Sequence, residues 1–181
     1  MKQKANNFAF IDNQNLNLGI RRLGWSLDYT KLRVYLKEKY QIETAYLFIG
    51  YMPENQGLYR KLQQCGFILI FKPVLEKKDG TIKGNVDAEL VLQAMIDFDE
   101  YDAAVIISSD GDFYCLVDYL YGKQKLKMVI SPCFKTCSIL LKKSAKEKIV
   151  FIDNIRKKLE YIKKDKKIPL KDKNLRGIFK S

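Results

Sequence analysis

Hydrophobic residues fall into six short runs along the chain, and most segments between the runs show the apolar spacing of a helix. The run Ala103–Ile107 is entirely apolar, as expected for a strand at the centre of a parallel sheet. The runs predict strands over Asn7–Asp12, Ile42–Tyr51, Phe67–Pro73, Ala103–Ser108, Lys125–Ile130 and Ile149–Ile152.

The segments between these runs predict helices, because their apolar residues recur three and four positions apart. Two segments are less regular. Asn13–Trp25 predicts a loop or a short helix, and the turn-rich Leu75–Asn85 predicts a small hairpin or a loop. Strands that alternate with helices indicate a doubly wound α/β sheet. The predicted helices are Tyr29–Tyr40, Pro53–Cys65, Val86–Phe98, Asp112–Tyr121 and Asp153–Lys163.

Length and charge divide the chain into two parts. It has 181 residues, a length typical of one domain, and a net charge of +12. Residues 1–141 carry 18 Lys and Arg against 16 Asp and Glu, whereas residues 142–181 carry 15 against 5. We therefore predict one domain over residues 1–162, a basic C-terminal arm over residues 163–181, and a polyanionic partner, most simply nucleic acid. The alternative is a solvated tail that only aids solubility.

The composition removes several classes of function. The longest uninterrupted apolar runs have five residues, far below the ~18 of a membrane span, so we expect no membrane association. Four cysteines without a histidine leave little for a zinc site and are typical of reduced thiols in a cytoplasmic protein. The sequence lacks the glycine-rich loops of nucleotide-dependent enzymes. Acid–base or metal chemistry must therefore rest on carboxylates, lysine, tyrosine or cysteine.

Four aspartates stand where an open α/β sheet binds its ligands, at the carboxyl ends of the strands. Asp12 ends the first strand, and Asp110 and Asp112 directly follow the fourth. Asp87 lies in the first turn of the helix before the fourth strand, on that helix's apolar face. We expect the first and fourth strands to be neighbours, so that these carboxylates meet.

Carboxylates that meet repel one another, and a hard divalent cation removes the conflict. Oxygen ligands suit Mg²⁺ or Mn²⁺, and such an ion activates water and stabilises charge on a phosphoryl group. The sequence therefore predicts metal-dependent hydrolysis of phosphodiesters. For each acid alone the alternative is structural: Asp110 or Asp112 caps the following helix, and Asp87 complements its helix dipole.

Three ordered motifs resemble those of NYN domains, which belong to the PIN-like nuclease superfamily, and the likeness is strongest to the LabA-like branch. The motifs are FIDNQNL (Phe10–Leu16), KGNVDAELVLQAM (Lys83–Met95) and SSDGDF (Ser108–Phe113). The resemblance implies a PIN-like three-layer α/β/α fold with a central, mostly parallel sheet. It also implies a Mg²⁺- or Mn²⁺-dependent ribonuclease whose catalytic metal ligands are Asp12, Asp87, Asp110 and Asp112.

Polar residues within or near the motifs are candidate substrate contacts: Asn15, Lys83, Ser109, Arg21 and Arg22. The two arginines and Trp25 form a basic patch with an aromatic ring, for which simple packing of the ring is the alternative. Many relatives carry a further aspartate where this chain has Gln93. That departure leaves open a catalytically weakened RNA-binding or regulatory module. RNA is favoured over DNA as the partner, and a homodimer is left open.

Overall fold

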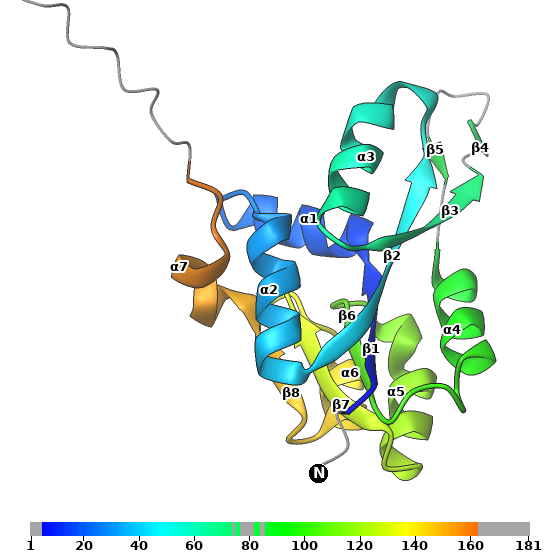
Figure 1. The fold of residues 1–181 in the computed structure, drawn as a ribbon. Helices are drawn as coiled ribbons and strands as arrows, with labels where there is room; N and C mark the ends of the chain where they lie inside the picture. Colours follow the sequence, from blue (N-terminus) through cyan, green and yellow to red (C-terminus); the bar gives the residue numbers. More distant parts are fainter. Residues whose placement is uncertain (1–4, 74, 77–81, 84–85, 163–181) are drawn as a thin grey trace, which may run out of the picture.

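The computed structural model describes residues 5–73, 75–76, 82–83 and 86–162. Its central sheet has six parallel strands in the order β3-β2-β1-β6-β7-β8 (Figure 1). Every predicted strand is present, and each boundary lies within one residue of its prediction. The strands are β1 (Asn7–Asp12), β2 (Ile42–Tyr51), β3 (Ile68–Pro73), β6 (Ala104–Ile107), β7 (Leu126–Ser131) and β8 (Ile149–Phe151).

A second, two-stranded antiparallel sheet is formed by β4 (Leu75–Glu76) and β5 (Ile82–Lys83), in agreement with the first of the two alternatives predicted for this segment, a hairpin or a loop. The helices are α1 (Asn13–Arg22), α2 (Tyr29–Tyr40), α3 (Gln56–Gln64), α4 (Asp87–Ile96), α5 (Tyr114–Gly122), α6 (Ile139–Ala145) and α7 (Arg156–Leu159). The 3₁₀ turns are η1 (Pro53–Asn55), η2 (Gly111–Phe113) and η3 (Ile152–Ile155). None of the helices in the described ranges has the length and apolar character that a bilayer crossing requires.

Residues of β1 alternate between two hydrophobic cores, one on each face of the sheet. Phe8 and Phe10 pack with residues of α4, α5 and α6, whereas Ala9 and Ile11 pack with residues of α1, α2, α3 and α7. The two groups of helices cover opposite faces of the sheet (Figure 1). The fold is therefore the predicted three-layer α/β/α arrangement, with all strands of its central sheet parallel.

The end of the described chain differs from the prediction. The sequence predicts one helix over Asp153–Lys163, but η3 and the single turn of α7 occupy its first part, and Lys163 lies outside the described residues. After Leu159 the chain extends and pairs with the segment before α2, where Glu160 bridges Leu27. The Asp28 N–H donates to the Leu159 carbonyl over 2.9 Å. These backbone bonds replace those of a longer helix.

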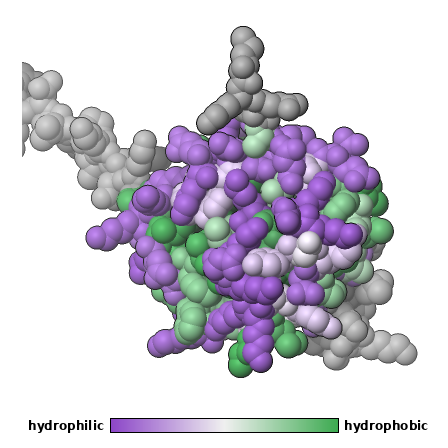
Figure 2. Space-filling model, turned by 90° about the horizontal axis from the view of Figure 1, so that it is seen from below, coloured by the Kyte–Doolittle hydropathy of each residue, from purple (hydrophilic) through white to green (hydrophobic). Residues whose placement is uncertain are grey.

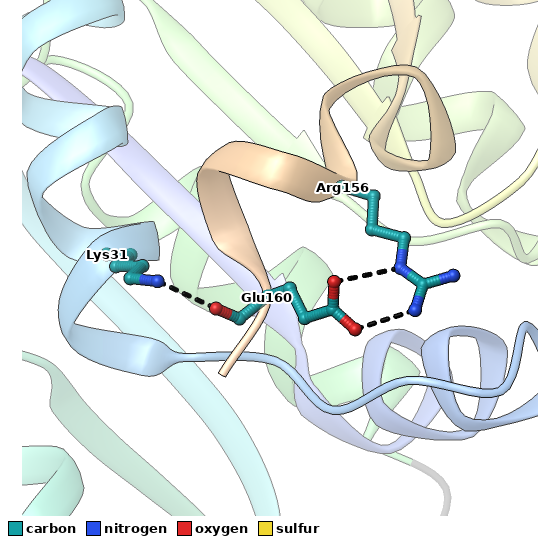
Figure 3. A network of polar contacts seen from close by, with 3 residues as sticks. All are labelled: Lys31, Arg156 and Glu160. Carbon is teal, nitrogen blue, oxygen red and sulfur yellow. Dashed lines mark hydrogen bonds and ion pairs between the residues drawn. The ribbon is translucent and has the colours of Figure 1, made fainter. Parts of the chain in front are cut away.

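Side chains hold this C-terminal segment against α2 (Figure 3). Lys31 Nζ donates to the backbone carbonyl of Glu160 over 2.7 Å. Arg156 binds the Glu160 carboxylate with two nitrogens, at 2.6 and 3.1 Å. The guanidinium of Arg156 also lies 5.9 Å from the ring centroid of the buried Trp25. The tail of the domain is thus fixed to its α1–α2 side.

The order of the strands reverses at β1. From β1 the chain first builds β2 and β3 on one side, and then β6, β7 and β8 on the other. As predicted, β1 and β6 are hydrogen-bonded neighbours. Ile11 lies opposite Ile107. In open α/β sheets the crevice at such a reversal, beyond the carboxyl ends of the strands, is where ligands bind.

Candidate functional site

Asp12 ends β1 and also caps α1. Its carboxylate accepts a hydrogen bond from the Asn15 N–H at 3.1 Å and another from the Ser108 hydroxyl at 3.2 Å. Only 5% of the residue is exposed. The buried carboxylate is thus held between the end of its own strand and the residue that follows β6.

Asp110 and Asp112 follow β6 through a tight turn. The Asp110 N–H donates to the Ser108 hydroxyl at 3.1 Å, and Asp110 Oδ1 accepts from the Asp112 N–H at 3.1 Å. Asp110 therefore caps η2, while Asp112 lies exposed on that turn. The predicted capping role of Asp110 is therefore confirmed. The cap uses one carboxylate oxygen, so the second is available to a ligand.

Asp87 begins α4 and brings the third element to the site. One of its carboxylate oxygens, Oδ2, is buried, in line with the predicted orientation towards the sheet. One carboxylate oxygen from each of Asp87, Asp110 and Asp112 lies within 4.8 Å of the other two. Two segments, the start of α4 and the turn after β6, therefore present three oxygens at the spacing a single cation can bridge, and Asp12 is not part of this group of three.

The pKa of Asp12 is raised by its surroundings, which include two of the other acids. Burial raises the pKa of its carboxyl from 3.8 to about 6, and the hydrogen bond from the Asn15 N–H opposes the rise. The neighbouring charges of Asp87 and Asp110 raise the same pKa further. The charges of Asp87 and Asp110 thus oppose the ionisation of Asp12, and a divalent cation would favour the charged form of that carboxyl.

Asn15 and Ser109 connect the two strands above the acids. Asn15 Oδ1 accepts from both the backbone N–H and the hydroxyl of Ser109, at 2.9 and 2.7 Å. These bonds tie the first turn of α1 to the segment after β6, across 94 positions of sequence. The structure thus gives both residues a positioning role, beside the substrate contact predicted from the sequence.

The structure places two of the predicted basic substrate contacts, Arg21 and Arg22, away from the acids. Arg21 and Arg22 are exposed in the last turn of α1, about 14 Å of helix rise beyond Asp12. Trp25 is buried in the core, so packing, and not stacking on a base, is its role. Lys83 lies in β5, and its side chain is outside the described part of the chain.

Gln93 lies more than a helical turn beyond Asp87 on α4. Its amide donates to the Asp97 carboxylate at 2.9 Å. Six positions along a helix turn a side chain by about 240° and raise it by about 9 Å, which separates Gln93 from Asp87. The amide therefore contacts a different carboxylate from those of the site.

Sequence reasoning missed the part played by two serines. Ser108 bonds both Asp12 and Asp110, and its place within the SSDGDF motif was the available signal. Ser138 caps α6 and donates its N–H to the Ser109 carbonyl at 3.0 Å. A Cβ on Gly111 would lie 2.5 Å from the Ser138 hydroxyl, so glycine is needed where η2 meets α6. A serine just before an apolar run signals a helix start.

The NYN domain family model matches residues 8–153, from β1 to η3, a span that contains all four acids. The chain belongs to the NYN domain family. This membership places it in the PIN-like superfamily and on a nuclease-like fold, as the three motifs predict.

Two relatives extend this result. The chain is 29% identical over 132 residues to the low amplitude and bright protein LabA of Synechococcus elongatus, covering 67% of this chain and 71% of that protein. It also resembles the crystal structure of a protein of unknown function from Vibrio parahaemolyticus, with a TM-score of 0.72 at 22% identity. That likeness covers 89% of this chain and 99% of the other, and it shows the shared fold.

The residues at this edge fit a divalent cation. Every acidic side chain in the group offers hard oxygen ligands, the preference of Mg²⁺ and Mn²⁺. The mutual spacing of the Asp87, Asp110 and Asp112 carboxylate oxygens, within 4.8 Å, and the raised pKa of Asp12 are the two observations of this structure that favour such an ion.

Proposed function

We propose that this NYN domain protein is a Mg²⁺- or Mn²⁺-dependent endoribonuclease that hydrolyses RNA phosphodiesters at the carboxyl edge of its sheet. The observation that carries the proposal is the group of carboxylate oxygens of Asp87, Asp110 and Asp112, beside the buried Asp12 whose pKa Asp87 and Asp110 raise, at the reversal of strand order. Family membership supports a nuclease-like fold, and the site supplies the chemistry that such a fold would use.

In this proposal Asp12, Asp87, Asp110 and Asp112 hold the cation. When bound, the ion supplies positive charge to the phosphoryl group and acidity to a nearby water. The protein contributes position. Ser108 fixes Asp12 relative to Asp110, and the Asn15–Ser109 contact keeps β1 and β6 in register above them. Pre-set ligands of this kind need little rearrangement when substrate arrives.

Charge supports nucleic acid as the substrate. Residues 142–181 carry 15 Lys and Arg against 5 Asp and Glu, a surplus that attracts a phosphate backbone. Residues 163–181, the predicted arm, lie outside the described residues. All four cysteines are free thiols, which favours the reducing cytoplasm as the location.

The proposal is tested by incubating the full chain with labelled single- and double-stranded RNA and DNA in Mg²⁺, Mn²⁺ or EDTA. We expect internal cleavage of RNA with either ion and none in EDTA. Cleavage that is undiminished in EDTA, or that is faster on DNA than on RNA, would contradict the proposal.

A second candidate is an RNA-binding or regulatory module with a weakened site. The observation in its favour is Gln93, whose amide donates to Asp97, at the position where the resemblance to NYN domains leads us to expect a further aspartate. RNA binding without cleavage in either metal would establish this candidate over the enzyme. Recovery of cleavage by Gln93→Asp would link the weakening to this position.

A further inference from the structure

A solvent-exposed aromatic ring lies on the loop that leaves β7 at the carboxyl edge of the sheet. Phe134 is 59% exposed. Its ring meets that of Phe151 edge-to-face at 5.2 Å between centroids. Lys142 Nζ lies 4.0 Å from the Phe134 ring centroid and donates to the Phe134 carbonyl at 2.7 Å. The ring is therefore both exposed and held in place.

The same loop is anchored to α1 at its start and to the turn that carries Asp110 at its end. Pro132, at its start, packs so closely on α1 that a Cβ on Gly19 would lie 2.6 Å from its side chain. Ser138, at its end, bonds Ser109 and contacts Gly111 in the turn that carries Asp110. Phe134 thus belongs to a loop fixed at both ends to elements of the candidate active site.

The surface around Phe134 is basic. Residues 132–148 contain five lysines and one glutamate. Lys135 and Lys143 are exposed, and Lys142 is half-buried against the ring. A surplus of lysine beside an exposed ring matches the two demands of a single strand, which are cations for the phosphates and a flat apolar surface for a base.

We propose that Phe134 and its surrounding lysines form a stacking platform for an unpaired nucleobase of the bound nucleic acid. Phe134 stacks on one base, while Lys135 and Lys143 contact phosphates of the same strand. The contacts of Ser138 with Ser109 and Gly111 hold this loop next to the turn that carries Asp110, so the adjoining phosphodiester is directed towards the acids. The role in guiding substrate rests on the proposed function, whereas the binding itself does not.

The protein offers a matched control at the other edge of the sheet. Tyr119 is 43% exposed, its ring lies 5.7 Å from that of Phe98, and Lys123 Nζ lies 5.6 Å from its centroid. The chemistry is similar to that at Phe134. Tyr119, however, lies near the end of α5, away from the acids that precede this helix. Only the aromatic beside the acids should contribute to binding.

The test measures binding of a fluorescent single-stranded oligouridylate to the full chain by anisotropy, in EDTA so that no cleavage occurs. Phe134→Ala should weaken binding about tenfold, and Phe134→Tyr should retain it, because a base stacks on either ring. Tyr119→Ala should bind like the wild type. Lys135→Gln should reduce the salt dependence of binding by about one phosphate contact. Binding of a duplex of equal length should not respond to Phe134→Ala.

Equal binding by the wild type, Phe134→Ala and Tyr119→Ala would overturn the platform. A lower molar mass of Phe134→Ala in light scattering, with unchanged oligonucleotide binding, would also overturn it by identifying a protein interface. The proposed function fails separately. A wild type that binds through Phe134 but cleaves nothing in either metal supports the platform and contradicts the nuclease.

Discussion

The two edges of the central sheet treat charge in opposite ways. At the amino edge, Lys125 Nζ donates to the carbonyls of Phe98 and Tyr101, and Asp102 accepts from the Asn6 N–H. At the carboxyl edge, like charges gather, and Asp87 and Asp110 raise the pKa of Asp12. Figure 2 views the molecule from the side where β1 begins, and the surface there is mostly hydrophilic with scattered apolar side chains.

This difference separates residues that stabilise the fold from residues that serve its chemistry. A charge that donates to backbone carbonyls lowers the free energy of the folded state. Carboxylates that lie close together raise the free energy of the folded state until a cation binds them. The carboxyl edge therefore carries electrostatic repulsion at the buried Asp12, and this pattern is typical of functional sites.

The largest expected effect is on cleavage. Asp12→Asn and Asp110→Asn remove charge from the carboxyl edge and should each reduce RNA cleavage about 100-fold or more, because the cation loses a ligand. Asp102→Asn at the amino edge is the matched control and should cleave at the wild-type rate. Single-turnover rates in Mn²⁺ measure the difference, and equal losses in all three variants would remove the distinction between the edges.

The second prediction concerns stability and pH. The raised pKa of Asp12 means that its contribution to folding is fully present below pH 3.8 and is lost as the pH rises through about 6. In EDTA at pH 8, Asp12→Asn should therefore raise the free energy of unfolding by up to about 3 kcal/mol. At pH 4 the gain should nearly vanish.

Urea unfolding of the wild type and Asp12→Asn at both pH values measures this gain. Addition of Mg²⁺ at pH 8 should stabilise the wild type and reduce the gap between the two proteins. A variant that is less stable than the wild type at pH 8 would show that the Asp12 charge is already well compensated.

The third prediction compares glycines near the two edges. A Cβ at Gly19 would meet Pro132 at 2.6 Å, so Gly19→Ala should destabilise the fold by about 1–3 kcal/mol. Gly122, at the end of α5, has nothing within 4 Å of its Cβ position, so Gly122→Ala should be neutral or stabilising by up to about 1 kcal/mol. Thermal unfolding of both variants checks this ordering, which the reverse result would contradict.

The smallest expected effect concerns the C-terminal arm. Residues 163–181 carry eight Lys and Arg against two Asp. Truncation after residue 162 should weaken RNA binding across sequences and flatten its salt dependence, because fewer counterions are released. Cleavage of a short saturating substrate should persist. An unchanged salt slope would assign the arm to solubility alone.

The sequence predicted the sheet well and the helices after β7 poorly. Apolar runs mark buried strands whatever surrounds them, and the strand boundaries follow them closely. Helix α6 was not predicted because its apolar residues are consecutive, and Ile139 and Leu140 face solvent at 68% and 53% exposure. Two features of the sequence could have indicated this helix: Ser138, which caps its start, and the lysines of its last turn.

For the candidate site, the sequence placed the acids at one edge but not their contacts. The end of a strand can be read locally, whereas the bonds of Ser108 and Asn15 join positions about one hundred residues apart and depend on strand order. Arg21 and Arg22 were assigned as substrate contacts because they form a basic patch with Trp25 in the sequence. In the structure Trp25 is buried in the core, and helix α1 separates the two arginines from Asp12.

The central claim is that the carboxyl-edge acids hold the cation on which cleavage depends. Its most direct test is Mn²⁺ titration of the full chain, with bound ion measured by electron paramagnetic resonance and RNA cleavage measured in the same samples. We predict that occupancy and rate rise together in the wild type and in Asp102→Asn, and that both are lost in Asp110→Asn. Undiminished Mn²⁺ binding and cleavage in Asp110→Asn would contradict the claim.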